Sequence, residues 1–199
     1  MLFRSAKTKS QLKPVIALVG LCGTGKSEAC AFLETQGYTL VYFGGVVMEE
    51  VAARGLAITP DNERAVREDL RVQHGMAAMA VMRLPQIRMH LAAGKAVAID
   101  GLYSLAEYEL LKTALKTEFG ALLKVLALHS PRSLRYSRLA ARAHRPLTPQ
   151  QVDERDMFEL KNLDKGGPIA LADAVISNDC ERATLQARLQ DVYLQLLES

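Results

Sequence analysis

Residues 20–27, GLCGTGKS, are the most informative stretch of the sequence. An apolar run, VIALV at 15–19, leads into it, and the helix-prone run SEACAFLE at 27–34 continues from it. The spacing G-x-x-x-x-G-K-[ST] between a strand and a helix is typical of a loop that cradles phosphate groups. Glycines let the backbone point successive N–H groups into one concavity, and the helix N-terminus adds partial positive charge there. The stretch therefore predicts a nucleotide phosphate site; the alternative interpretation is a glycine-rich turn that binds nothing.

Two side chains of this loop carry most of its expected chemistry. We expect Lys26 to reach the β- and γ-phosphates of a nucleotide and the Ser27 hydroxyl to ligate Mg²⁺. Lys26 is therefore a candidate catalytic residue and Ser27 a candidate metal ligand. The pattern itself assigns nucleotide binding to Gly20, Gly25, Lys26 and Ser27.

Length and composition favour one globular domain in a reducing compartment. The chain has 199 residues, of which 49% are apolar, and its formal net charge of +3 is too small to argue for nucleic acid. Its three cysteines are far apart, as expected in a reducing cytoplasm rather than in a disulfide framework or a zinc site. The basic segment 1–13 lacks the apolar core of a secretory signal, and no apolar run approaches the ~20 residues of a membrane helix. We expect a basic tail at 1–13, one domain at 14–199, a cytoplasmic location and no membrane partner.

Short apolar strands alternate with helical segments along the chain. The expected strands are Val15–Val19, Thr39–Phe43, Ala96–Asp100, Leu122–Leu128 and Ala174–Ser177. Strands that are apolar throughout are buried on both faces, so the pattern predicts an α/β fold with a parallel sheet between two helical layers. In such sheets ligands bind at the carboxyl ends of the strands. Candidate site residues should therefore follow the strands directly.

Capping residues mark the expected helix boundaries. A long helical stretch over about 60–93 has Thr59 as its N-cap, and we expect Gly75 and Pro85 to break or kink it. Another helix begins after Thr148, which starts a capping box.

An acidic residue ends the third expected strand. Asp100 closes the apolar run AVAID at 96–100 and precedes Gly101. In enzymes with a phosphate-binding loop, an acid at this place holds the metal ion or accepts the proton of the attacking group. We therefore expect Asp100 to be a catalytic and metal-binding residue. The alternative interpretation is a turn or helix-capping aspartate.

Four arginines follow the fourth expected strand at helical spacing. Arg135, Arg138, Arg142 and Arg145 fall on one face of an ideal helix, within an arc of about 80°, and no acidic residue lies among them. Unpaired arginines repel one another unless an anion joins them, and the guanidinium group suits phosphate. We interpret these arginines as a lid that closes over a polyphosphate. The alternatives are a solvated basic face and a nucleic-acid surface, although only Tyr136 interleaves for base stacking.

The nucleotide base is expected near the loop that follows the last strand. This loop reads Ser177-Asn178-Asp179, and Asn178 is the candidate contact. Loops that read guanine use N-K-x-D, and the sequence has no such tetrapeptide. Adenine, and hence ATP, is therefore the favoured nucleotide.

The motifs GLCGTGKS, VAIDGLYS, RDMFEL and ADAVISND resemble, in this order, those of P-loop nucleoside monophosphate kinases. The likeness is closest to the branch described as adenylate-kinase-related or dephospho-CoA-kinase-like, and it covers nearly the whole chain from residue 14. It implies a five-stranded sheet with strand order 2-3-1-4-5, and ATP with Mg²⁺ as the phosphoryl donor. It also implies that Gly23 and Thr24 join the nucleotide-binding set and that Arg138 and Arg142 are catalytic residues of a helical lid over about 131–165.

The acceptor side departs from that family. Gly45, Met48 and Tyr103 stand where its members tend to carry an acid and two arginines, whereas Arg71 resembles an arginine on the acceptor side. We expect Arg71 and Tyr103 to bind an acceptor that has a hydroxyl nucleophile and at most one anionic group. Two function classes remain open: a small-molecule kinase, and a nucleotide-binding switch or slow ATPase that acts on a partner protein.

Overall fold

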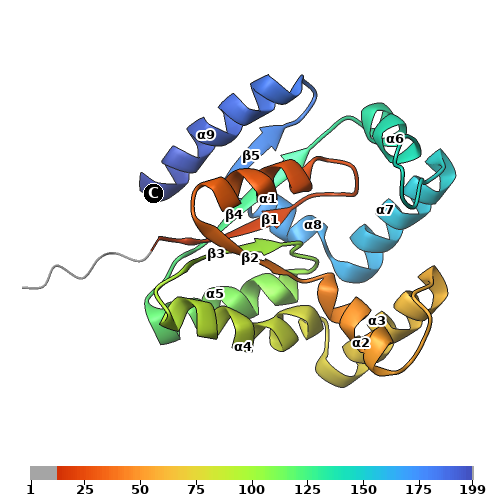
Figure 1. The fold of residues 1–199 in the computed structure, drawn as a ribbon, viewed down its shortest axis with the longest axis horizontal. Helices are drawn as coiled ribbons and strands as arrows, with labels where there is room; N and C mark the ends of the chain where they lie inside the picture. The colour runs from red at the N-terminus through yellow and green to blue at the C-terminus, as the bar shows by residue number, and fades with distance from the viewer. Residues whose placement is uncertain (1–12, 199) are drawn as a thin grey trace, which may run out of the picture.

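The computed structural model describes residues 13–198, so residues 1–12 of the expected tail at 1–13 lie outside the described residues. Its centre is a five-stranded sheet in the order β2-β3-β1-β4-β5, in which all neighbouring strands are parallel (Figure 1). The strands are β1 (Val15–Val19), β2 (Tyr38–Tyr42), β3 (Ala96–Asp100), β4 (Leu123–His129) and β5 (Ala174–Ser177). The expected parallel sheet and its strand order are confirmed, and only β2 and β4 are shifted, by one residue each.

Helices cover both faces of the sheet. They are α1 (Lys26–Thr35), α2 (Gly45–Ala53), α3 (Pro60–His74), α4 (Ala78–Ala92), α5 (Leu105–Phe119), α6 (Arg132–Ala140), α7 (Pro149–Leu163), α8 (Gly166–Ala170) and α9 (Arg182–Glu198). Figure 1 shows α1 and α9 on one face and α4 and α5 on the other. Alternate residues of β1 enter the two cores: Ile16 packs with α1 and α9, and Ala17 with α4 and α5. This two-sided burial explains why β1 is apolar at every position.

The expected helix over 60–93 is divided into α3 and α4. The division lies at Gly75, whose φ of 74° ends α3 in a conformation that suits glycine. Pro85 does not break the helix, because α4 continues through it to Ala92. Proline leaves the carbonyl oxygen four residues earlier without its donor, and that residue, Val81, lies on the solvent-exposed side of the helix. Water can therefore replace the missing hydrogen bond.

Both expected N-caps are confirmed. The Thr59 side chain accepts a hydrogen bond from the Asn62 N–H at 3.3 Å. At α7, the Gln151 N–H donates to Thr148 Oγ1 at 3.3 Å, and the Thr148 N–H donates to Gln151 Oε1 at 2.9 Å. This reciprocal pair satisfies two backbone donors that the first turn of a helix leaves free.

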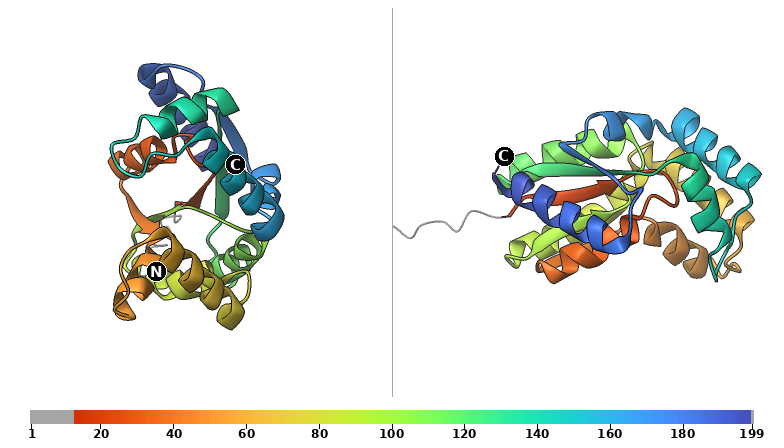
Figure 2. Two further views of the ribbon diagram at one scale, coloured as in Figure 1. Left: turned by 90° about the vertical axis from the view of Figure 1, so that its right-hand side faces the viewer. Right: turned by 90° about the horizontal axis from the view of Figure 1, so that it is seen from above.

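Four helices lie beyond the carboxyl ends of the strands. Both α2 and α3, on one side, and α6 and α7, on the other, occupy the same end of the molecule (Figures 1 and 2). The helices α6 and α7 make up most of the predicted lid, residues 131–165. Among residues 13–198, no helix is both long enough and apolar enough to cross a membrane. The loop at 20–27 opens toward the space between these helix pairs.

Candidate active site

The phosphate-binding loop, residues 20–27, has a conformation that requires glycine. Gly20 has a φ of 145° and Gly25 a φ of 96°. A Cβ atom on Gly20 would overlap the carbonyl oxygen of Leu128 in β4, and one on Gly25 would overlap the side-chain amide of Asn178. Only glycine allows both the positive φ and the close approach. The loop is therefore held tightly against the sheet, with the N-terminus of α1 at its end.

Lys26 is the first residue of α1, and its ammonium group lies inside the loop. Its Nζ donates hydrogen bonds to the carbonyl oxygens of Gly20 at 2.8 Å and Leu21 at 3.1 Å. Burial, followed by the positive charge of Lys165, lowers the pKa of Lys26 to about 8. Among the described residues this ammonium group hydrogen-bonds only to neutral oxygens, so a bound anion would stabilise it.

Two residues of the expected nucleotide-binding set form hydrogen bonds that hold the loop in its conformation. The Thr24 hydroxyl is buried and donates to the carbonyl oxygen of Leu21 at 2.9 Å. The Asn178 side-chain amide is also buried, and it donates to the carbonyl oxygen of Thr24 at 2.9 Å. Asn178 lines the cavity in front of the loop, whereas Thr24 and Gly20 do not. The geometry thus gives the Asn178 amide a role in holding the loop.

The expected face of four unpaired arginines is wrong. Helix α6 ends at Ala140, so the last two arginines lie outside it. The buried guanidinium of Arg135 forms two hydrogen bonds with the Asp156 carboxylate of α7. Arg145 pairs with Glu63 of α3 at 2.8 Å. Both acids are distant in the sequence, which is why the local charge pattern suggested arginines without partners.

Arg138 and Arg142 do line the cavity in front of the loop. Arg138 donates to Ser130 Oγ at 3.0 Å, to the Asn178 carbonyl oxygen at 3.1 Å and to Asn178 Oδ1 at 3.2 Å. Arg142 Nη1 lies 3.7 Å from Cys22 Sγ. Among residues 13–198, neither guanidinium forms an ion pair with a carboxylate. Their charges are therefore available to an anion in the cavity.

Ser27 and Asp100 line the same cavity from two neighbouring elements, α1 and β3. A hydroxyl and a carboxylate are oxygen ligands of the kind that Mg²⁺ prefers, and Mg²⁺ commonly completes its shell with water and substrate phosphates. No group of three or more His, Cys, Asp or Glu side chains that could hold a metal gathers within residues 13–198. The donor set at the loop thus fits Mg²⁺ bound together with a nucleotide.

Among the charged residues of the cavity that the sequence interpretation did not assign, Arg155, Glu159 and Lys165 form a cluster. Glu159 is buried, and its carboxylate accepts from Arg155 Nε at 3.1 Å and from Lys165 Nζ at 2.8 Å. Burial alone would raise the pKa of Glu159, but the charges of Lys165 and Arg155 outweigh it and lower the pKa to about 2. The motif RDMFEL at 155–160, in which Arg155 and Glu159 stand at i, i+4 spacing, was the sequence signal for part of this cluster.

Two cavities meet in front of the loop. The donor cavity, of about 480 Å³, is lined by the loop, Asp100, Arg138 and Lys165. The acceptor cavity, of about 780 Å³, lies between α2 and α3 on one side and the predicted lid on the other. Six residues line both: Cys22, Tyr42, Tyr103, Arg142, Arg155 and Glu159. These six residues form the shared wall of the two cavities.

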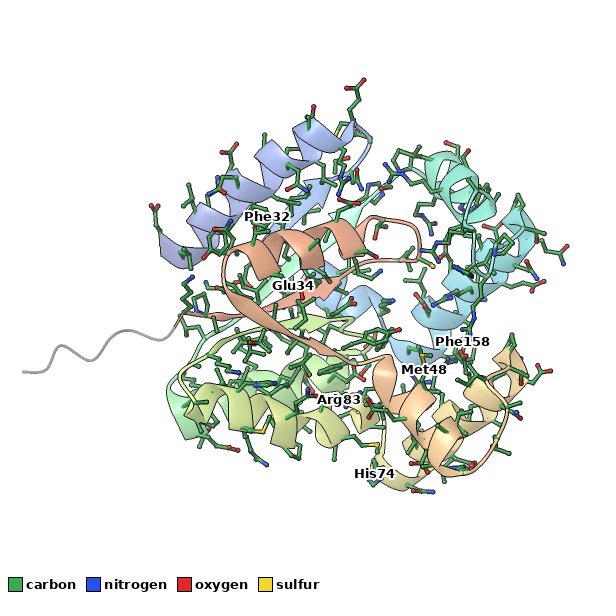
Figure 3. The ribbon with its side chains drawn as sticks, in the orientation of Figure 1. Phe32, Glu34, Met48, His74, Arg83 and Phe158 are labelled. Atoms are coloured by element: carbon green, nitrogen blue, oxygen red, sulfur yellow. The ribbon has the colours of Figure 1, made fainter. Side chains whose placement is uncertain are left out.

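The acceptor cavity combines arginines with apolar side chains. Arg64, Arg67 and Arg71 line it from α3. Met48 from α2 and Phe158 from α7 also line it (Figure 3). The structure thus places both expected acceptor residues, Arg71 and Tyr103, in its wall, together with Arg64 and Arg67. Burial, then the charge of Arg67, lowers the pKa of Arg71.

Comparison with known proteins identifies the family. A family model described as an AAA domain matches residues 16–159. A UPF0200 protein of Thermococcus onnurineus is 35% identical over 185 residues, which are 92% of this chain and 98% of the relative. The chain belongs to this AAA domain family and to the UPF0200 family. A further UPF0200 relative, PH1008 of Pyrococcus horikoshii, is 30% identical over 93% of this chain and 98% of the relative's length.

Solved structures of P-loop kinases share the fold of this UPF0200 protein. A gluconokinase from Sinorhizobium meliloti superposes with a TM-score of 0.56 at 16% identity, over 94% of this chain and 95% of the other. A shikimate kinase from Bacteroides thetaiotaomicron superposes with a TM-score of 0.57 at 14% sequence identity, over 94% of this chain and 99% of the other. A dephospho-CoA kinase from Campylobacter jejuni superposes with a TM-score of 0.53 at 14% sequence identity, over 94% of this chain and 100% of the other. The scores are similar, so the fold is that of P-loop kinases and no single branch is favoured.

Proposed function

We propose that this protein is an ATP-dependent phosphotransferase that moves the γ-phosphoryl group of ATP to a hydroxyl group of a small molecule. The observation that carries the proposal is the shared wall of the donor and acceptor cavities. The phosphates of a nucleotide on the loop would extend to this wall, and an acceptor could reach them from the other side. Direct transfer needs this adjacency because the attacking and leaving oxygens lie roughly in line on the phosphorus atom.

The chain's own residues supply charge and position for this transfer. Lys26, Arg138 and Arg142 surround the expected phosphate position. Fixed cations stabilise the charge that spreads over the transferring oxygens, and they do so most strongly in the transition state. The acceptor oxygen bonds to the γ phosphorus while the bond to the β–γ bridging oxygen breaks. ADP leaves with that electron pair, and Asp100, which lines the donor cavity, would accept the hydroxyl proton.

Ser27 and Asp100 would hold Mg²⁺ in this proposal. Both residues line the donor cavity next to Lys26, and their oxygens suit this ion. Bound Mg²⁺ neutralises phosphate charge during transfer.

The acceptor cavity indicates the chemistry of the acceptor. Arg64, Arg67 and Arg71 offer positive charge from α3, while Met48 and Phe158 offer apolar surface. An acceptor with a hydroxyl nucleophile, an apolar or stackable body and an anionic group fits this lining. Dephospho-CoA is one candidate, and a modified nucleoside or a sugar derivative is another. Because three arginines line the acceptor cavity, we extend the expectation of at most one anionic group to acceptors that carry more than one.

A nucleotide-binding switch or slow ATPase is the alternative function. It is favoured by the acceptor side, where Gly45, Met48 and Tyr103 replace the acid and arginines that the resemblance leads one to expect. A switch would hydrolyse ATP slowly and respond to a partner protein, whereas a kinase would release ADP faster only with the right acceptor.

We place the reaction in the cytoplasm. Cys22, Cys30 and Cys180 are all free thiols, as suits a reducing compartment.

An acceptor screen tests the proposal. Thermal-shift measurements with nucleotides, CoA precursors and phosphorylated metabolites would select ligands, and ADP release would then be measured with each. We expect one chemical class to accelerate ADP release, and Asp100→Asn to abolish the acceleration. If no compound accelerates ADP release while a partner protein does, the switch is the correct function.

A further inference from the structure

The cluster of Lys165, Glu159 and Arg155 has no role in the transfer described above. The Lys165 ammonium is 2% exposed, lies 2.8 Å from Glu159 Oε2 and stands 4.9 Å from the centroid of the Tyr103 ring. Lys165 lines the donor cavity, and both Tyr103 and Glu159 belong to the shared wall. A buried cation therefore lies where the two cavities meet.

The charges of this cluster do not cancel. Glu159 carries one negative charge, whereas Arg155 and Lys165 carry one positive charge each, so the cluster keeps one excess positive charge. The positive charge of Lys165 also lowers the pKa of Lys26, in addition to the effect of burial. Both ammonium groups line the donor cavity, so an anion bound there could contact them both.

The backbone holds Lys165 in place before any ligand binds. Asp164 ends α7 with a φ of 52°, and the Lys165 N–H donates to the carbonyl oxygen of Glu159 at 3.2 Å. The positive φ of Asp164 is that of a left-handed helix end. Immediately afterwards α8 begins, and Gly167 in α8 packs closely against Leu105 of α5 (Figure 1). A cation on so fixed a segment loses little entropy when it binds a phosphate.

We infer that Lys165 is a second catalytic lysine, whose ammonium group contacts the transferring phosphoryl group at the shared wall while Glu159 positions it. The inference rests on the proposed function and adds a residue to it. Lys26 would serve the phosphates on the loop side, and Lys165 would serve the same group from the side of Tyr103 and Glu159. Because the charge on the transferring oxygens develops in the transition state, Lys165 should discriminate between ADP and a mimic of that state.

The test compares two complexes that need no acceptor: Mg-ADP, and Mg-ADP with aluminium fluoride in place of the transferring group. The variant is Lys165→Met, and the matched control is Lys161→Met, an exposed lysine of α7. Calorimetry should show that Lys165→Met changes the Mg-ADP dissociation constant by less than about twofold and weakens the fluoride complex at least about tenfold, as expected for one lost charge-assisted hydrogen bond. Lys161→Met should bind both as the wild type does.

Three outcomes would overturn the inference. A Lys165→Met protein that binds both complexes like the wild type would show that Lys165 only supports the fold. Equal weakening of both complexes would show uniform nucleotide binding without preference for the transferring group. A wild-type protein that binds neither complex would overturn the proposed function and this inference with it.

A second measurement covers the case in which Lys165→Met does not fold. NMR follows the side-chain ¹⁵Nζ resonance of Lys165 in the wild-type protein. This resonance is assigned by correlating it with the backbone resonances of Lys165. Adding aluminium fluoride to the Mg-ADP complex should shift this resonance, whereas adding Mg-ADP alone should leave it nearly unchanged. A resonance that aluminium fluoride does not move contradicts contact with the transferring group.

Discussion

At the scale of single residues, the site is governed by partly buried cations with incomplete compensation. Within residues 13–198, the Lys26 ammonium bonds only to carbonyl oxygens, and Arg138 bonds to a hydroxyl, a carbonyl and an amide oxygen. A bound polyanion stabilises such groups by supplying the missing counter-charge. Without a counterion, removing a charge from water costs free energy. The residues thus favour binding of a nucleotide phosphate chain over an empty cavity.

The first prediction concerns Lys26. We expect Lys26→Ala to weaken Mg-ATP binding at least tenfold, because the loop loses its only side-chain cation. Calorimetric titration measures the effect, with unchanged circular dichroism as the control for folding. An unchanged dissociation constant would contradict the assignment of the loop.

At the scale of elements, one buried ion pair joins the two helices of the predicted lid. Arg135 of α6 forms two hydrogen bonds with Asp156 of α7, and it also donates to the Cys22 carbonyl oxygen at 3.1 Å in the phosphate-binding loop. Both side chains of the pair are nearly inaccessible to solvent. The contact therefore fixes α6 and α7 to each other and to the loop.

Breaking this pair is the second prediction. Arg135→Met should lower the free energy of unfolding by about 3–5 kcal/mol, because Asp156 would remain as a buried charge without its partner. The matched control is Arg132→Met on the same helix, whose guanidinium is largely exposed and 3.6 Å from Asp153, and it should cost less than about 1 kcal/mol. Urea unfolding followed by circular dichroism measures both values, and equal losses would contradict the account.

A buried acid at the start of α5 gives the third prediction, on pH. The Glu107 carboxylate accepts from the Tyr103 N–H at 2.7 Å, and burial raises its pKa to about 7 despite this bond and the nearby charge of Arg71. The native state therefore binds the proton more tightly than the unfolded chain, whose pKa is 4.5, so this group's contribution to stability is lost as the pH rises from 4.5 to 7.

Comparing wild type with Glu107→Gln isolates this effect. The variant cannot titrate and its side-chain carbonyl can still accept the Tyr103 hydrogen bond. Its free energy of unfolding relative to wild type should rise by roughly 3 kcal/mol between pH 4.5 and pH 8. Urea unfolding at a series of pH values measures the difference, and a difference that does not vary with pH would show that Glu107 is not buried as a neutral acid.

Elements were predictable from the sequence where local chemistry decides them. The apolar run at 15–19, the loop at 20–27 and the capping box at Thr148 each define their structure within a few residues, and the structure agrees. Pairing between distant segments was not predictable. Arg135 seemed unpaired because Asp156 belongs to the next helix, and nothing near Lys165 in the sequence indicated that its ammonium is buried against Tyr103.

At the scale of the whole molecule, two helix pairs enclose the space beyond the sheet. The α2–α3 pair supplies arginines and apolar surface to the acceptor cavity, while α6 and α7 supply the charges near the loop. Arg145 and Glu63 connect the two sides through an exposed ion pair at 2.8 Å. The shared wall of the cavities thus depends on segments far apart in the chain, and it gives the molecule a place where donor and acceptor could meet.

The central claim, transfer from ATP to a small molecule, is tested most directly by following the γ-phosphoryl group itself. The wild-type protein is incubated with ATP labelled with ³²P at the γ position and with the compounds selected by thermal shift, and the products are separated. We predict that the label moves into an organic product bearing a new phosphate ester, and that Lys26→Ala abolishes this transfer. Label found only in inorganic phosphate, at a rate that no small compound changes, would contradict the claim.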